Sequence, residues 1–506
     1  MEMELNKQKI EFYSGVYESC IVHEASGEHI IPDTSPDMMR IITSNGKCCV
    51  KNKETNAGNI VVSGVVEGCV LYVAEGEKNV RKLDVNIPFS HRFESSEITK
   101  DMPCVISSEL ITLEAREINS RKIALRAQIA IDAKCYAIKH MGITQEIENE
   151  NEYSVKVKTG TVDMYLPCMI RERSFTIIDD MEIPKTIPDF ETMLESSVAL
   201  DCTDMKIIGN KAIFKGIATI KSTYISNDGT LNVMTQNLPY SQIMDVDEFE
   251  EECDLELKMS IRACDINAAH DMTGDARYIS VNILVDTILT VHLKKQIPAV
   301  EDLYSTSYAL SPQFEDVTIQ RLCSKENKRV TVNEKVETAN TVKRILDAKV
   351  ILEPMRRNVD KLQNNAQIQI VYTDDNDQIY SVHRKCGVLC DLMSEDRQKI
   401  ICDLSVAGIN ATGRENQIAV QFFVDYDIKV IGEDRIRNLK KLSCGERFTN
   451  KSDEATVIVK HIYTEQPLWN IAKKYNTTVE EIAAANCLES FENAAAGSVL
   501  LIPCGK

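Results

Sequence analysis

The sequence lacks most of the features that mark exported, membrane-spanning or disulfide-stabilised proteins. No uninterrupted apolar run approaches the roughly 20 residues that a bilayer-spanning helix needs. The polar, acidic start MEMELNKQKIEFY has no apolar segment of the kind found in secretory signals. No C-x-x-C pair occurs, and the 17 cysteines are scattered and odd in number. We therefore predict a chain kept in the cytoplasm, with buried, reduced thiols acting as small apolar groups.

Signatures of catalysis and metal binding are also missing. The chain has no G-x-x-x-x-G-K-[ST], G-x-G-x-x-G, H-E-x-x-H or G-x-S-x-G sequence. His23 and His29 are six residues apart, which does not place them on one helical face, so we interpret them as loop residues. The run Asp374-Asp375-Asn376-Asp377 begins like a calcium loop, but Lys385 stands where that loop needs an acid, so it predicts a hairpin turn. The sequence predicts no catalytic residue, no metal site and no cofactor.

The charge is strongly of one sign. Asp and Glu number 77 against 58 Lys and Arg, a formal net charge of −19. Such a chain repels phosphates and anionic lipids, so we expect no nucleic-acid partner and no direct membrane insertion. One basic run is interpreted as a solvated linker, with steering of the C-terminal region toward an acidic partner as the alternative. Its members are Arg435, Arg437, Lys440, Lys441 and Arg447.

A paired-strand pattern is present in three copies. In each, apolar residues alternate with other residues, a period of two that predicts a strand with one core face. These alternating segments are 123–133, 279–293 and 418–430. Each follows another alternating strand and a predicted turn that carries a shared dipeptide. The dipeptides are Ile118-Asn119, Ile266-Asn267 and Ile409-Asn410, and Asn suits a chain reversal.

A second shared block lies upstream of each hairpin. Residues 61–90 align with 213–241, so that Gly64 matches Gly216 and Tyr72 matches Tyr224. The dipeptide Asp228-Gly229 predicts a tight hairpin. Copy three keeps only residues 368–382 and lacks the glycine, so it is interpreted as degenerate. A looser third block begins at Pro32, Pro188 and Thr338, and helix is expected only in short connectors.

These blocks resemble the SPOCS domain, a β-rich module of spore-forming Firmicutes. The resemblance is strongest in GVVEGCVLYVA and IPF of copy one, and it covers most of residues 1–440. It implies three tandem β-rich SPOCS modules, at residues 1–148, 149–300 and 301–440, the last one degenerate. The predicted fold is therefore mainly β. Residues 441–455 are polar without apolar periodicity and are interpreted as a linker.

The last fifty residues predict a small α+β domain of order βααβ. A β-branched strand at 456–462 precedes a helix at 467–475, where Pro467 stands near the helix start. A second helix follows from Thr478, which forms a capping box with Glu481, and residues 499–502 are the closing strand.

This segment, residues 456–506, resembles a LysM domain through LWNIAKKYNTTVEEIAAAN and GSVLLIP. LysM domains usually bind N-acetylglucosamine polymers between two loops, here residues 464–468 and 486–490. In this chain Glu465-Gln466 replaces the usual Gly-Asp, and LESFENAAA lengthens the second loop. Because glycine lets backbone approach a sugar closely, its loss favours a protein partner over a glycan.

Trp469 is the only tryptophan and has two interpretations. It packs on the small core, or it is a partly exposed anchor in a partner's groove, and both can hold together. Val457 and Val459 face a similar choice between the inner and outer sides of their strand. The predicted partner-binding residues are Val457, Val459, Glu465, Gln466, Leu468, Trp469, Asn486 and Leu488.

Three SPOCS-like copies followed by one LysM-like domain resemble a clostridial family of spore coat-assembly proteins. The resemblance implies a non-enzymatic scaffold in the mother-cell cytoplasm, at the forespore surface and spore coat. It implies that the LysM domain binds SpoIVA, a coat-basement ATPase, and that SPOCS modules bind other coat proteins. The alternative is a protein that binds peptidoglycan, an N-acetylglucosamine polymer, in the spore cortex or wall. An enzyme with an unrecognised pocket is a weaker third option.

Overall fold

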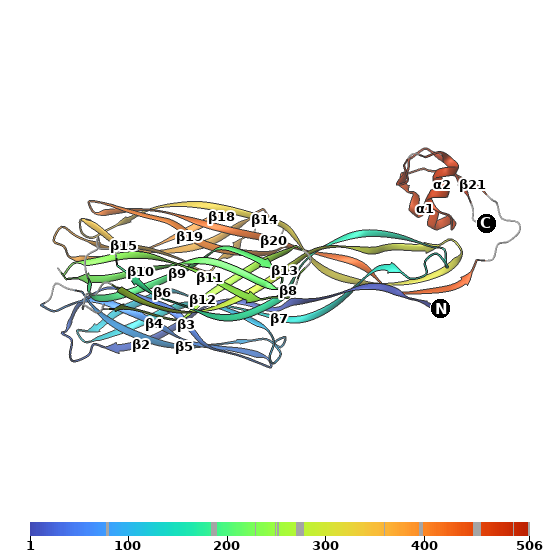
Figure 1. Cartoon of the computed structure of the whole chain (residues 1–506). Coiled ribbons are helices and arrows are strands. Elements are labelled where there is room, and N and C mark those ends of the chain that lie inside the picture. Colours follow the sequence, from blue (N-terminus) through green and yellow to red (C-terminus); the bar gives the residue numbers. More distant parts are fainter. Residues whose placement is uncertain are drawn as a thin grey trace.

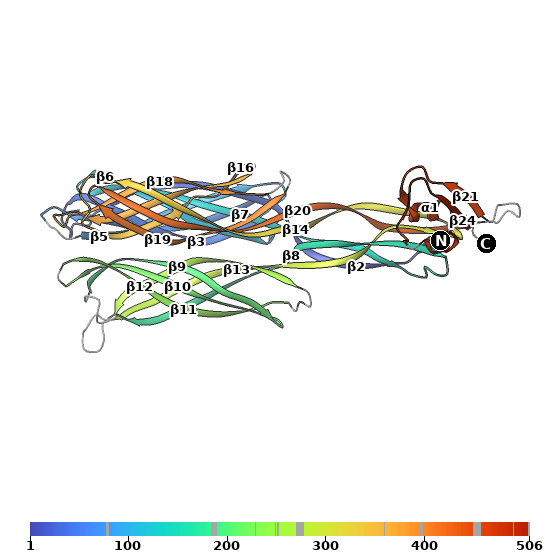
Figure 2. The same cartoon turned by 90° about the horizontal axis from the view of Figure 1, so that it is seen from above.

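The computed structural model describes residues 1–76, 80–183, 190–227, 229–247, 249, 252–269, 278–358, 360–393, 398–448, 457–488 and 490–503. Three β-sandwiches lie side by side and form a head (Figures 1 and 2). Their longest strands continue past the sandwiches and form a stalk, and the C-terminal domain lies at the far end of that stalk. Within the described residues, no helix is both long and apolar enough to cross a bilayer.

The first sandwich, module 1, has six strands in two antiparallel sheets. They are β2 (Leu5–Ile30), β3 (Met38–Asn56), β4 (Asn59–Ala74), β5 (Val80–Glu94), β6 (Cys104–Asn119) and β7 (Lys122–Ile147). One sheet has the order β2-β7-β6 and the other β3-β4-β5. Alternate side chains of both sheets point inward, as the period-two pattern of Ile123–Ala133 predicts, and they form one buried core.

Modules 2 and 3 repeat this topology. Module 2 comprises β8 (Val155–Glu182), β9 (Phe190–Ile208), β10 (Lys211–Ser226), β11 (Leu231–Asp245), β12 (Cys253–Ala269) and β13 (Tyr278–Ser305). Module 3 comprises β14 (Tyr308–Glu337), β15 (Arg344–Leu352), β16 (Arg356–Asn358), β17 (Lys361–Thr373), β18 (Ile379–Asp391), β19 (Lys399–Arg414) and β20 (Gln417–Arg447). The short β1 (Glu2–Met3) pairs with β20. Copy three therefore keeps both sheets, and its irregularity is the division of one strand into β15 and β16.

Two of the predicted boundaries fall inside strands. β13 continues beyond residue 300 to Ser305, and β20 continues beyond residue 440 to Arg447. The start of the predicted linker at 441 is therefore wrong, because residues 441–447 are paired strand. Leu442 and Cys444 are buried in the stalk, while the polar Lys441 and Ser443 are exposed. Residues 449–455, the last part of that predicted linker, lie outside the described residues.

The shared Ile-Asn dipeptides do not mark the strand reversals in all copies. Only Asn119 lies beside its turn, where its Oδ1 accepts a hydrogen bond from the Arg121 N–H at 3.0 Å. Asn267 is paired with Ser280 inside the ladder. Asn410 adjoins a register shift and lies several residues before the turn at Glu415, which has φ 49°. Alternation continues through the dipeptide in the later copies, so the pattern alone does not say where the chain turns.

Other sequence-based expectations have mixed outcomes. The prediction of a loop for His23 and His29 is wrong, because both lie in β2. The hairpin turn at Asp374 is confirmed: its Oδ1 accepts hydrogen bonds from two backbone N–H groups, at 2.9 and 2.8 Å. In the predicted tight turn, Gly229 has φ 80°, while Asp228 lies outside the described residues. None of the 16 described cysteines forms a disulfide, but the prediction of burial fails for Cys20, Cys202 and Cys487, which are exposed.

The three sandwiches meet through a bulge that all of them share. In each module, the strand β3, β9 or β15 has one extra residue at the same position relative to its partner strand. This residue lies beside the register partner of the buried Tyr72, Tyr224 or Tyr372. The extra residues are Ile42, Leu194 and Leu346, and they pack into one cluster contributed by all three modules. A bulge bends its strand and re-aims side chains, so it points these groups out of their own module and into the head centre.

The stalk is held by a core that no single module supplies. The paired ends of β2 and β7, of β8 and β13, and of β14 and β20 lie together and bury their inward residues. This core includes Ile10, Ile143, Met164, Leu166, Ile297 and Ile319. Nearer the tip, Met3, Val155, Leu303 and Leu442 continue it. The stalk therefore holds the three modules in alignment and places the C-terminal domain at a distance from the head.

The glycine shared by two modules is required by close packing. A Cβ at Gly64 would lie 2.3 Å from the Cys49 carbonyl oxygen and 2.8 Å from the Phe89 ring. Gly216 has the same relation to Asp201 and Tyr240. In module 3 the equivalent residue is Asn364, and its register partner is the smaller Val388 in place of an aromatic residue. Module 3 therefore lacks both the glycine and the aromatic ring that packs against it in modules 1 and 2.

We expect Gly64→Ala to lower the free energy of unfolding by about 1–3 kcal/mol, because overpacking against backbone forces the strands apart. Equilibrium unfolding in urea, followed by circular dichroism, measures this. Gly15→Ala is the matched control, since nothing lies within 4 Å of a Cβ there. Equal midpoints for the two variants would contradict the packing argument.

Candidate partner-binding surface

The C-terminal domain has a two-stranded sheet with two helices on one face. Its elements are β21 (Val457–His461), β22 (Gln466–Pro467), α1 (Leu468–Tyr475), α2 (Val479–Asn486), β23 (Asn493–Ala494) and β24 (Val499–Pro503). α2 begins with the predicted capping box, in which Thr478 and Glu481 each accept a backbone N–H. Ile462, Ile471, Ile482 and Ile502 form the buried core. The predicted βααβ order is confirmed, with the two-residue pair β22 and β23 added.

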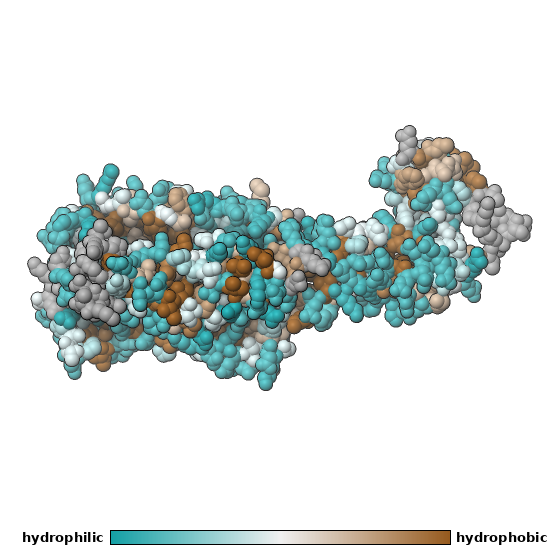
Figure 3. All heavy atoms as spheres, in the orientation of Figure 1, coloured by the Kyte–Doolittle hydropathy of each residue, from teal (hydrophilic) through white to brown (hydrophobic). Residues whose placement is uncertain are grey.

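The face of the sheet opposite the helices is apolar and exposed. It consists of Val457, Val459, Val499 and Leu501, which we call the apolar strip. Their exposed fractions are 48, 65, 57 and 42 %. Val459 and Leu501 are register partners, so the strip crosses both β21 and β24. Figure 3 shows hydrophobic residues on the surface of this domain above a mostly hydrophilic stalk.

The apolar strip extends onto the following turn. The Tyr463 side chain is 85 % exposed, and its ring centroid lies 4.9 Å from that of His461. Val457 and Val459 thus take the outward option that the sequence left open. Val499, Leu501 and Tyr463 are additions that the prediction missed. The alternation of residues 499–502 against 457–462 carries the signal that would have found the first two.

The two loops that would border a glycan groove are joined to one another. β22 pairs with β23, so Gln466 lies opposite Ala494 and Pro467 opposite Asn493. The Leu468 N–H donates to the Glu492 carbonyl at 2.9 Å. The Asn493 side chain donates to Glu465 Oε1 at 3.0 Å. Glu465 and Gln466, which replace the usual Gly-Asp, therefore take part in closing the lengthened second loop onto the first.

Three of the predicted contact residues hold the domain together. Leu468 is fully buried in the core. Asn486 links α2 to β24 by hydrogen bonds. Its side-chain amide donates to the Ile482 and Leu501 carbonyls at 2.7 and 2.6 Å, and its side-chain oxygen accepts the Leu501 N–H at 2.7 Å. Leu488 is half-buried and packs against the same core. All three residues therefore contribute to the fold of the domain, and partner contact by the half-buried Asn486 and Leu488 stays a prediction.

Trp469 lies against the stalk. Its indole Nε1–H donates to Asp302 Oδ2 on β13 at 2.9 Å, and its ring meets Tyr304 edge-on with centroids 4.9 Å apart. Lys473, one helical turn later, donates to Asp302 Oδ1 at 2.5 Å. Burial raises the pKa of Asp302, but hydrogen bonds from Lys473, Trp469 and the Leu303 N–H outweigh it, so the pKa lies below its usual value. Trp469 as a partner anchor stays a prediction.

The basic run lies on the stalk and not in a linker. Arg437 stacks over Phe314, with its guanidinium carbon 4.4 Å from the ring centroid. Lys440 pairs with Glu315 at 3.2 Å and Lys441 with Glu2 at 3.7 Å. Arg447 stands 6.0 Å above the Tyr308 ring, and Arg435 is exposed on β20. Several of these charges are already engaged by neighbouring stalk residues, which the sequence pattern did not indicate.

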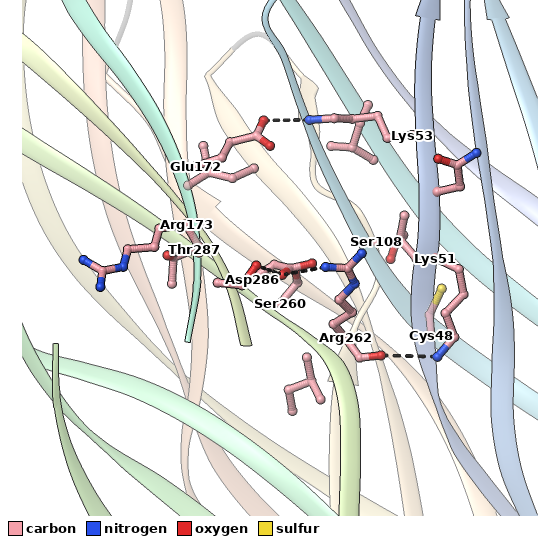
Figure 4. A pocket seen from close by; sticks show the side chains of 16 residues that line it. Cys48, Lys51, Lys53, Ser108, Glu172, Arg173, Ser260, Arg262, Asp286 and Thr287 are labelled. Atoms are coloured by element: carbon pink, nitrogen blue, oxygen red, sulfur yellow. Dashed lines mark hydrogen bonds and ion pairs between the residues drawn. The ribbon is translucent and has the colours of Figure 1, made fainter. Parts of the chain in front are cut away.

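A cavity of about 220 Å³ lies where module 1 meets module 2 (Figure 4). Its charged side chains come from both modules and are arranged in pairs. Lys53 meets Glu172 at 2.6 Å, and Arg262 lies 3.7 Å from Asp286, which also accepts the Ser174 hydroxyl at 2.6 Å. Burial raises the pKa of the Cys48 thiol there to about 11, which disfavours the thiolate. The Lys53–Glu172 pair joins the two modules, whereas Arg262 and Asp286 both belong to module 2. We assign the cavity to the interface between the modules.

We expect Asn486→Ala to lower the unfolding free energy of the C-terminal domain by about 2 kcal/mol, since each of its hydrogen bonds contributes about 1 kcal/mol net. Urea unfolding followed by fluorescence of the single tryptophan measures this. Asn493→Ala, which removes one exposed hydrogen bond, is the control and should cost less than about 0.5 kcal/mol. If the two variants have the same unfolding free energy, the hydrogen bonds of Asn486 do not stabilise the domain.

Comparisons with known proteins identify the domain types. The family described as SipL, SPOCS domain, matches residues 37–118 and 189–269, which lie in modules 1 and 2. The LysM domain family matches residues 467–503. No curated protein and no solved structure matches the chain. Both domain families are binding modules, and together they support a binding or scaffold role connected with the spore coat. The chain thus contains SPOCS domains of the SipL type and ends in a LysM domain.

Proposed function

We propose that the protein is a non-enzymatic scaffold of spore coat assembly. In the mother cell, at the forespore surface, its LysM domain binds a SpoIVA-type coat-basement ATPase while the SPOCS head binds other coat proteins. The observation that carries this proposal is the apolar strip of Val457, Val459, Val499 and Leu501, which lies at the opposite end of the molecule from the head. One chain therefore offers two separated binding ends, as a tether requires.

The chemistry of the apolar strip favours a protein partner. Burying an exposed Val or Leu side chain fully is worth roughly 1.5–3 kcal/mol, so a partner that covers the strip gains substantial affinity. The strip is aliphatic and offers no hydrogen-bond donors or acceptors from its side chains. A sugar polymer presents hydroxyl groups that need such partners when they leave water. A sheet or helix with an apolar face fits the strip better.

The loop pairing argues in the same direction. A glycan would have to enter between residues 464–468 and 486–490, but β22 and β23 join the first loop to the residues that end the second. Glu465 accepts a hydrogen bond from the Asn493 side chain, which ties the first loop to the second. The pairing of these loops thus supports a protein partner over a glycan.

The head suits the second half of a tether. Every module has two open sheets, and the edge strands of such sheets can accept another chain or a flat partner. When both ends of one scaffold engage the same polymer layer, the second contact forms at high effective concentration and overall binding strengthens.

We expect Val459→Glu to weaken co-purification with the SpoIVA-type ATPase at least about tenfold, because a carboxylate buried against a partner loses hydration and each 1.4 kcal/mol is tenfold. The domain should stay folded, since Val459 is 65 % exposed. Ala484→Glu, which adds the same charge at an exposed site on α2, is the control. Undiminished capture by folded Val459→Glu protein would remove the apolar strip from the contact.

The alternative function is peptidoglycan binding, which LysM family membership itself favours. Sedimentation with insoluble peptidoglycan separates the two functions. Under our proposal the full chain stays in the supernatant, and Val459→Glu changes nothing in that assay. Saturable retention that survives Val459→Glu would instead support a glycan site elsewhere on the domain.

A further inference from the structure

The tip of β13 is shaped differently from the strand that leads to it. A bulge interrupts the pairing of β13 with β8 between Val300 and Asp302, so Glu301 is an extra residue. Val300 and Leu303 both point into the stalk core, where each is 1 % exposed. Asp302 and Tyr304 consequently face outward, although strict alternation from Val300 would have turned them inward. Bulges of this kind re-aim side chains at a chosen target.

The target of both re-aimed side chains is the LysM domain. The Asp302 carboxylate receives one hydrogen bond on each oxygen, from Lys473 and Trp469. The Tyr304 hydroxyl donates to the Thr477 carbonyl at 2.9 Å, in buried surroundings. The contacted residues lie on α1 and just after it, so one side of one helix meets both stalk groups.

Tyr304 belongs to the LysM core more than to the stalk. Its side chain is 6 % exposed, and it clusters with Leu468, Ile471 and Ile482. Burial raises the pKa of Tyr304, as expected for a phenol withdrawn from water. An aromatic ring that faces outward at a stalk tip would be exposed if no domain covered it. The same patch therefore provides a charge-assisted anchor and an apolar contact beside it.

We propose that the bulged tip of β13 is a docking site for the LysM domain of the same chain, with Asp302 as its anchor. The docked face is the one that carries Trp469, Lys473 and Thr477, and it is distinct from the apolar strip on β21 and β24. Docking sets the direction in which the apolar strip points, and this consequence rests on the proposed function. Trp469 is then a positioning residue, which acts on a partner by holding the domain in place.

Covalent connection makes the intramolecular contact favourable. The end of β20 lies at the same stalk tip as β13, and the chain continues from it into the LysM domain. A contact inside one chain forms at the high effective concentration that a short connection provides, so a small interface suffices. Docking on a second molecule would lack this advantage and would depend on protein concentration.

The single tryptophan reports the contact directly. In the full-length protein, Trp469 fluorescence and its quenching by acrylamide measure how far the indole is covered. We expect Asp302→Ala to shift the emission to longer wavelength and to raise quenching, with the docked-to-released ratio falling at least about tenfold, a change of 1.4 kcal/mol. Glu301→Gln is the matched control, because the neighbouring Glu301 pairs with Lys158 on the stalk at 2.8 Å.

A second variant guards against local unfolding. Tyr304→Phe keeps the ring and removes only the hydroxyl that donates to Thr477, so it should raise quenching by a smaller amount. Unchanged emission and quenching in both Asp302→Ala and Tyr304→Phe would overturn the docking site. If the Trp469 emission or quenching of the wild-type protein changes with protein concentration, docking within one chain is overturned. The LysM domain then docks on a second copy of the chain.

Binding of the ATPase separates this inference from the proposed function. If Val459→Glu abolishes capture while Asp302→Ala changes fluorescence and weakens capture less, both proposals stand. If Val459→Glu has no effect but Asp302→Ala still exposes Trp469, the docking site stands and the proposed partner surface falls.

Discussion

The stalk core is the constraint on which the rest of the molecule depends. A two-stranded ribbon exposes both faces and is marginally stable alone, so none of the three ribbons can extend from the head by itself. Together they bury Ile143, Leu166, Ile297 and Ile319, contributed by all three modules. This mutual burial requires every module to be present and aligned. It also explains why β1 pairs with β20, since that pairing joins the beginning of module 1 to the end of module 3.

The modules also contact one another in the head, where polar contacts select which modules lie side by side. The residue after each shared bulge reaches a neighbouring module, but its chemistry differs in each case. The Thr43 hydroxyl accepts a hydrogen bond from Gln369, the Asp347 carboxylate from Lys221, and the half-buried Glu195 carboxylate from Asn45 at 2.9 Å. Burial raises the pKa of Glu195. A polar contact that is satisfied by only one neighbour penalises the wrong arrangement, so these three pairs distinguish modules whose apolar cores are alike.

Sequence patterns predicted the local structure well. The alternation of residues 123–133 and 418–430 located core strands, the alignment of Gly64 with Gly216 identified equivalent positions, and the capping box at Thr478 located α2. These features depend on neighbours along the chain, which the sequence displays. One failure involves the stalk, where polar residues on the outer face of residues 441–447 concealed a paired strand. Alternation also gave no means of placing the turns near Asn267 and Asn410.

The candidate surface was predictable only in part. Val457 and Val459 were named, because a short strand with helices on one side must expose alternate residues. The contact of Trp469 with Asp302 joins groups 167 residues apart and depends on a bulge, for which the sequence has no local signal. Asn486 looked like a loop residue of a groove, but its amide is committed to Ile482 and Leu501. These hydrogen bonds could be recognised only once β24 was placed beside α2.

The length of β20 has a mechanical consequence. This strand has 31 residues and runs through both head and stalk, with β14 paired along it and β19 and β1 beside it. A pull on the chain beyond Arg447 acts along the strand axis, so many backbone hydrogen bonds share the load and resist together. A molecule anchored at both ends in a growing shell would therefore transmit tension through its backbone ladder before any sandwich opens.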